Sequence, residues 1–466
     1  MSFESIPPEL RIHILQALDK PSLHKVVSAS PTYHETYTFA RRALLHNLAQ
    51  QQYGLVDLAE PVAAIRSEGL YADVAANKQK IIALLDRRRR HSELGLSRKD
   101  PKAGAPGNID ESIKLLHLYS KLNTILQAYC QHAPCPPWVD QETWRTQYLP
   151  LQLTETERAR LIRTLCHVQT FYNLVGAREW TPEWEQEMQT TTLSPSMTPP
   201  ILRKSSTWYR NFTTNEIWNL FFGTMPPWEV EEFGSVWVFI RDQYRSMFDE
   251  ISREFPRSDA RWRSLRPNSL PAEMINLYPE AEDDPAPGKF TKYFLFKKKK
   301  GLLLTVPAPA NDYSYYDYCN HLVSLGPSFL YKTLTQSSYK DRRNLLARNA
   351  IASKSSFPDL VEVIKDPSPL LYPADKYESS DIARTLPTMP LLEQPNLGWK
   401  QHWHRDGVVE RVVFATRPRV TVDEAEIPEL WLSEGDLERT IGYFDGWEWG
   451  YSLLDSTRFP ASFVMP

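Results

Sequence analysis

Proline outnumbers glycine by more than two to one in this chain, with 37 prolines and 17 glycines. Proline ends helices and cannot occupy a central strand, because its ring fixes φ and its nitrogen has no hydrogen to donate. The balance therefore predicts helices joined by stiff connections that prolines mark.

The length of 466 residues predicts one small N-terminal module and one large body, or two bodies. Hydrophobic residues make up 42% of the chain, enough for an ordinary core. The formal net charge is −3, so no overall field would draw the protein to nucleic acid or to an anionic membrane. Neither is therefore an expected partner.

Cysteine usage is sparse for so long a chain. The four cysteines are Cys130, Cys135, Cys166 and Cys319, which fits free thiols in a reducing compartment. The first residues lack the pattern of a secretory signal, and no run approaches the ~18 apolar residues of a membrane helix. We expect a cytoplasmic or nuclear location, or both.

Residues 1–53 show the clearest helical punctuation in the chain. The segment Ser5–Glu9 carries two prolines and an acid, which suit a first helical turn. Ser22 is expected to cap a second helix, and Ser30-Pro31 to open a third. The apolar positions expected to line these three helices are Leu10, Ile14, Leu15, Leu18, Leu23, Val26, Val27, Tyr33, Tyr37, Leu44 and Leu48.

Beyond this module, we divide the chain into a helical region at 54–186, a linker at 186–206 and a helical body at 207–466. Thr154 and Glu157 form a capping-box pattern, and Gly176 stands where that helix should stop. Further helices are expected at Glu229–Phe255, Tyr318–Leu325 and Phe329–Ile351. Minor β structure is expected in a hairpin within 290–306 and a strand at Val408–Thr416.

The N-terminal motif resembles a known module. The run Ile6-Pro7-Pro8-Glu9-Leu10, continuing to Leu18, is similar to the opening helix of an F-box. Leu23 and Val27 match the apolar positions of its second helix, and Ser30-Pro31-Thr32-Tyr33 matches the start of the third. This variant resembles F-box-like proteins of filamentous fungi over about the first 50 residues, with a weaker likeness at Trp449-Gly450-Tyr451 and Asp455. The fold expected is therefore mainly α, with a three-helix F-box-like module packed on a large helical body with minor β.

The resemblance implies a function in recruitment. In F-box proteins this module docks on the small adaptor subunit of a cullin-containing (SCF-type) ubiquitin ligase, and the rest of the chain selects a target protein. The residues that would form or support the docking surface here are Ile6, Pro7, Leu10, Ile14, Leu15, Leu18, Leu23, Val27 and Tyr33. The third helix departs from most F-boxes, because Tyr33 or Tyr37 stands where a Trp is usual. A protein-binding scaffold that retains the fold without the ligase is the alternative.

Enzyme-like patterns are incomplete. His402, His404 and Asp406 form the best metal-ligand spacing, yet a polar surface stretch explains them better. Cys130-x-His132-x-x-Cys135 is half of a zinc pattern without its second half. We therefore expect no catalytic residue, metal or cofactor, and no enzyme activity.

Two further features have open interpretations. The basic run Arg87–Arg90 suits either nuclear import or a solvated helix end. The excess of Trp and Tyr between Trp399 and Trp449 is more typical of core than of a ligand groove.

Overall fold

The computed structural model describes residues 3–93, 104–179, 181, 211–212, 216–217, 220–222, 225–254, 321–352, 390–398 and 445–460. This part of the chain is mainly helical and contains no strand, which confirms the predicted main class. Both β predictions and the linker at 186–206 lie outside the described residues.

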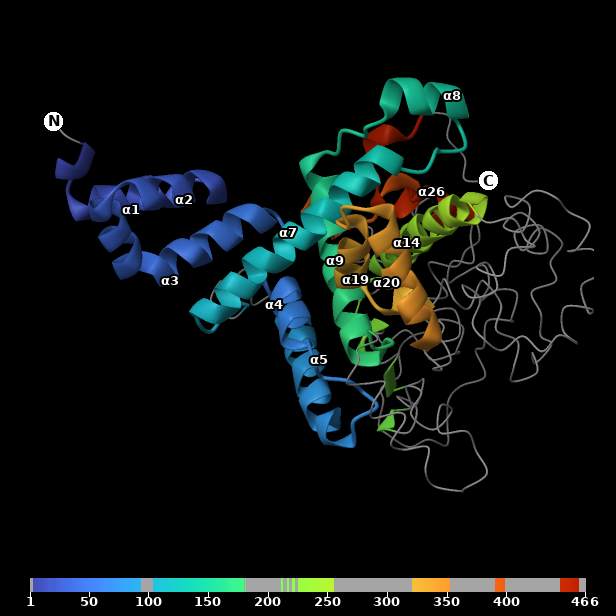
Figure 1. Cartoon of the computed structure of the whole chain (residues 1–466), viewed down its shortest axis with the longest axis horizontal. Coiled ribbons are helices and arrows are strands. Elements are labelled where there is room, and N and C mark those ends of the chain that lie inside the picture. Colours follow the sequence, from blue (N-terminus) through green and yellow to red (C-terminus); the bar gives the residue numbers. More distant parts are fainter. Residues whose placement is uncertain are drawn as a thin grey trace, which may run out of the picture.

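The helices occur in two groups along the chain (Figure 1). The N-terminal group comprises η1 (Phe3–Ser5), α1 (Pro8–Gln16), α2 (Lys20–Ala29) and α3 (Pro31–Tyr53). The body comprises α4 (Ala59–Arg66), η2 (Ala75–Asn77), α5 (Lys78–Glu93), α7 (Ile109–His132), α8 (Gln141–Thr143), η3 (Trp144–Tyr148), α9 (Glu155–Val175), α14 (Pro227–Glu254), α19 (Pro327–Leu334), α20 (Tyr339–Ala352), η8 (Leu391–Glu393), α26 (Asp445–Trp449), η9 (Tyr451–Leu453) and η10 (Ser456–Arg458).

Side-chain caps define the ends of the N-terminal helices. Ser30 caps α3 as predicted, because its hydroxyl accepts a hydrogen bond from the Tyr33 amide at 3.5 Å. The predicted capping residue of α2, Ser22, is wrong by three positions. Asp19 is the cap, and its carboxylate accepts from the Ser22 amide at 3.0 Å. Ser22 already lies within the first turn, so its amide is the group that needs a cap.

The module of α1, α2 and α3 projects from the body in Figure 1. Helices α1 and α2 both pack on α3, and α3 packs on α7. Tyr53 ties the end of α3 to the body by donating a hydrogen bond from its hydroxyl to the Leu115 carbonyl at 3.1 Å. The long third helix therefore carries the first two helices and joins them to the body.

Helix α9 forms the axis of the body. Helices α4, α7, α14 and α19 all pack on it, so nearly every side chain from Thr156 to Val175 is buried. The predicted capping box is confirmed: the Glu157 amide donates to Thr154 Oγ1 at 3.1 Å, and the Thr154 amide donates to Glu157 Oε2 at 2.9 Å. Gly176 ends the helix as predicted, and a Cβ there would lie 2.1 Å from the Ser324 carbonyl oxygen.

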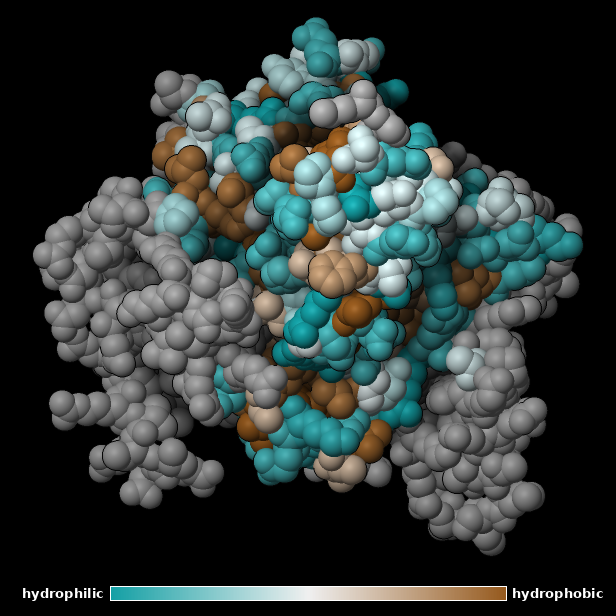
Figure 2. Space-filling model, turned by 90° about the vertical axis from the view of Figure 1, so that its left-hand side faces the viewer, coloured by the Kyte–Doolittle hydropathy of each residue, from teal (hydrophilic) through white to brown (hydrophobic). Residues whose placement is uncertain are grey.

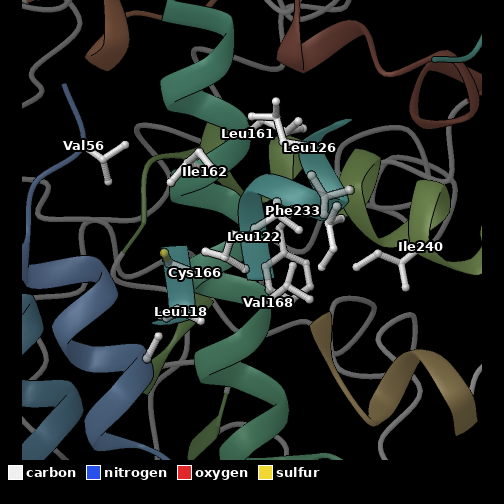
Figure 3. Packing of buried hydrophobic residues seen from close by; sticks show 14 of the residues in the cluster. Val56, Leu118, Leu122, Leu126, Leu161, Ile162, Cys166, Val168, Phe233 and Ile240 are labelled. Carbon is white, nitrogen blue, oxygen red and sulfur yellow. The ribbon is translucent and has the colours of Figure 1, made fainter. Parts of the chain in front are cut away.

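Apolar side chains from α7, α9 and α14 make the centre of the core. Figure 3 shows Leu122, Val168 and Phe233 within one cluster, and each of the three is fully buried. Phe233 also packs edge-on against Phe171 and Phe222, with ring centroids 5.6 and 5.1 Å apart. None of the described helices is long and apolar enough to cross a membrane.

The later helices follow the predictions with one correction. Helix α14 matches the prediction of Glu229–Phe255 to within two residues at each end. The single helix predicted at Phe329–Ile351 is two helices, α19 and α20, because Ser338 interrupts it. The Ser338 hydroxyl accepts a hydrogen bond from the Asp341 amide at 3.1 Å, and a new helix begins there.

Candidate docking surface

Helix α1 begins where the chain leaves an extended residue, Pro7, and Pro8 occupies the first helical position. Proline suits that position because its missing N–H needs no partner there, and Glu9 places an acid near the positive end of the helix. The two leucines of this helix differ in solvent exposure. Leu15 is 1% exposed, whereas Leu10 is 54% exposed.

The nine predicted docking residues fall into three groups. Leu15, Leu23 and Tyr33 are buried, and they form the core of the module. Ile14, Leu18 and Val27 are partly buried and pack against that core, and Ile6 is also partly exposed. Pro7 and Leu10 are exposed. A docking surface on this module would therefore consist of the exposed Pro7 and Leu10 with the partly buried side chains beside them, and the buried group would support it.

Tyr33 supports the module from within. Its ring stacks on that of Phe3 at 5.0 Å, and its hydroxyl donates to the Phe3 carbonyl at 3.3 Å. Ser30 reinforces the same junction by donating to the Glu4 carboxylate at 2.7 Å. Tyr33 is fully buried, so it offers no aromatic contact to a partner.

Two large side chains that the sequence analysis missed add to the exposed apolar surface. Phe39 on α3 is 89% exposed, and Phe3 is 56% exposed. Phe39 lies off the face that carries Tyr33, Tyr37 and Leu44, and this departure from the helical stripe is the signal that could have found it. Figure 2 views the molecule from the side on which the module projects. Hydrophobic areas there are small and separated by hydrophilic ones.

A second cluster, of buried charges, lies between α9, α14 and α4. Arg163 contacts Glu229 at 2.9 Å and Glu232 at 2.7 Å. His167 lies 2.9 Å from Glu60. Burial raises the pKa of Glu229, although the Arg163 charge opposes that rise. For Arg163 itself, burial lowers the pKa, but the charges of Glu229 and Glu232 outweigh that effect and raise it.

This buried charge cluster joins helices. Arg163 pairs directly with the carboxylates of Glu229 and Glu232, and buried charges need such pairing. No group of three potential metal-binding side chains occurs among the described residues. We therefore interpret the cluster as a structural lock between α9 and α14.

The zinc half-pattern does not form a site within the described residues. Cys135 donates through its thiol to the Val139 carbonyl at 3.2 Å, and His132 Nδ1 lies 3.0 Å from the Ala128 carbonyl oxygen. Burial raises the pKa of both Cys130 and Cys135, which favours their protonated thiol form. His402, His404 and Asp406, the other metal candidates, lie outside the described residues.

The described part of the aromatic C-terminal region is core. Trp447, Trp449 and Tyr451 are 6%, 7% and 0% exposed. Trp449 contacts Trp138 edge-on at 5.0 Å, which ties this region to the segment after α7. The interpretation of the aromatics between Trp399 and Trp449 as core rather than as a ligand groove is therefore supported for Trp447 and Trp449.

Comparison of the chain with protein-family models, with curated proteins and with solved structures found no match. Two features of the chain favour a docking surface, namely the order of residues in the N-terminal motif and the exposure of its apolar side chains.

Proposed function

We propose that this chain is a substrate-receptor or adaptor subunit of an SCF-type ubiquitin ligase, which recruits a target protein and performs no catalysis of its own. Its N-terminal module would bind the small adaptor subunit of the ligase, and the helical body would hold the target. The expected partners are thus proteins. The chain would act by holding the target close to the ligase.

The observation that carries this proposal is the exposure of Leu10 on a helix whose other leucine is buried. A module of three helices is too small to hide every apolar side chain that it carries. Here Leu15 fills the small core while Leu10 faces outward with 54% of its surface exposed. An exposed leucine next to Pro7 and the half-covered Ile14 gives a partner protein an apolar centre with a polar surround, the usual anatomy of an interface.

The arrangement of the helices also supports docking. Helices α1 and α2 pack on α3, and α3 makes the main contact of the module with the body through α7. In Figure 1, α1 lies on the side of the module away from the body, which gives a partner room to approach it.

The test is co-purification of the full chain with the ligase adaptor subunit. We expect the wild-type chain to co-elute with it, and the double variant L10D/I14D to lose this because two charges enter the apolar centre. The matched control is L55D/L391D, which changes two leucines that are 50% and 68% exposed elsewhere. Equal co-elution of all three chains would disprove the docking surface.

The alternative is a protein-binding scaffold that keeps the F-box-like fold without the ligase. The burial of Tyr33 favours it, because large aromatic anchors often dominate interface energy and this one is not available. A wild-type chain that folds and fails to bind the adaptor would select this alternative.

A further inference from the structure

Residues 445–459, here named the aromatic segment, consist of pieces too short to be stable alone. Helix α26 has five residues, and η9 and η10 have three each. Isolated helices shorter than ~12 residues are marginal in water. The conformation of the segment therefore depends on its contacts with the body.

One face of α14 receives this segment. Glu231, Gly234 and Ser235 follow one another at helical spacing and so share a face. Trp447 covers Gly234 so closely that a Cβ there would lie 2.1 Å from the indole ring. Ser235 and Ser452 share a hydrogen bond of 2.8 Å.

Glu231 is the polar centre of the contact. Its Oε2 accepts hydrogen bonds from the Trp447 indole N–H and, at 3.0 Å, from the Tyr451 hydroxyl. The Glu231 residue is only 2% exposed. Two ring donors from the segment thus meet one buried carboxyl group of the body.

Among the residues that the structure describes, no cation is paired with the Glu231 carboxyl group. On α9, Arg163 pairs with Glu229 and Glu232, and Arg160 pairs with Asp455 at 2.6 Å. In the segment, Arg458 pairs with Glu157 at 2.8 Å. Further along α14, Arg241 lies 3.5 Å from Asp242 and faces the Trp237 ring. Among the described ion pairs none includes Glu231.

Burial without a cation favours the neutral form of Glu231. It raises the pKa of this carboxyl to about 7 from the ordinary 4.5, while the hydrogen bonds from Trp447 and Tyr451 limit the rise. When the segment leaves α14, water reaches Glu231 and the pKa returns toward its ordinary value.

We propose that the aromatic segment is a proton-controlled clasp on α14, closed while Glu231 is protonated and loosened when Glu231 ionises. The closed state holds the proton more tightly than the open state. Its stability therefore falls as pH rises from about 4.5, and the fall levels off above about 7. These two limits give about a tenfold rise in the open fraction between pH 6 and pH 8.

Hydrogen exchange on the full chain tests the clasp. Protection of amides in 445–459 and in α9 would be measured at pH 6 and pH 8, after correction for intrinsic exchange rates. We expect protection of the aromatic segment to fall about tenfold while that of α9 stays constant. An unchanged segment, or an equal loss in α9, would overturn the proposal, because the second result describes unfolding of the whole body.

Two variants assign the effect to Glu231. In E231Q the pH dependence of the segment should disappear, while E250Q, at an exposed site on the same helix, should keep it. In Y451F the ionised Glu231 carboxylate loses one hydrogen-bond donor, so the pKa of Glu231 in the closed state should rise further. Protection of the segment should therefore keep falling to a higher pH than in the wild type. If E231Q keeps the wild-type dependence of segment protection on pH, the clasp is refuted. If E231Q does not fold, the same result in Y451F refutes it.

Discussion

Arg163 on α9 donates two hydrogen bonds to Glu232 on α14, at 2.9 and 2.7 Å, with both side chains almost fully shielded from solvent. Thr164 adds a third donor to the same carboxylate at 3.2 Å. Glu232 is one of two carboxylates that compensate the buried Arg163 charge, and without it only Glu229 remains as the partner of Arg163.

We therefore expect E232A to lower the free energy of unfolding by about 3 kcal/mol. Replacing both partners, as in R163M/E232M, should cost less than the sum of the two single variants. Urea denaturation of E232A, R163M, E232M and R163M/E232M measures this, with E250A as the exposed control on α14. Strict additivity would show that Arg163 and Glu232 do not interact energetically.

The two leucines of α1 should respond differently to truncation. L15A removes a side chain that is 1% exposed, so we expect a loss of about 2–5 kcal/mol. L10A removes one that is half exposed and should cost less than about 1 kcal/mol. Thermal melts followed by circular dichroism compare the two directly. A large loss in L10A would place this side chain in a core contact and remove it from the docking surface.

The capping box of α9 makes a testable contribution to stability. T154A removes the hydroxyl that accepts from the Glu157 amide, and loss of such a cap costs about 1 kcal/mol. T154S keeps the hydroxyl and should remain within about 0.5 kcal/mol of the wild type. The hydroxyl also donates to the Asp455 carboxylate, so chemical denaturation of the pair separates the effect of the hydroxyl from that of the methyl group, and equal loss in both would point to the methyl group.

Gly234 should tolerate no side chain while Trp447 covers it. G234A places a Cβ 2.1 Å from the indole ring, so the aromatic segment must shift, and overpacking of this kind costs about 1–3 kcal/mol. In a W447A background the same change should cost much less, because the obstructing ring is gone. Denaturation of the four chains forms a double-mutant cycle, and a coupling energy near zero would contradict the contact.

Local sequence signals predicted the helices well where a cap and an apolar stripe agree. Ser30, the Thr154–Glu157 box and Gly176 each mark an observed helix end. Asp19 was missed because two residues, Asp19 and Ser22, both have side chains that can cap, and the choice depends on where the first turn begins.

The contacts between distant segments could not be predicted from sequence. The Asp455 amide donates a hydrogen bond to Glu157, 298 residues away in the sequence. No local sequence pattern around either residue predicts this contact. The same limit applied to the docking residues. Leu10 and Leu15 belong to one apolar stripe, and only the placement of α3 decides which is covered.

The dependence of α9 on residues far downstream sets an order for biosynthesis. Arg458 lies 301 positions after Glu157 in the sequence and donates a hydrogen bond to it. A ribosome must therefore add all of those residues before α9 can make its full set of contacts. At about 5–20 residues per second, the wait lasts roughly 15 to 60 seconds. During that time the nascent chain presents uncovered apolar helices to the cell, and it is an expected client of chaperones.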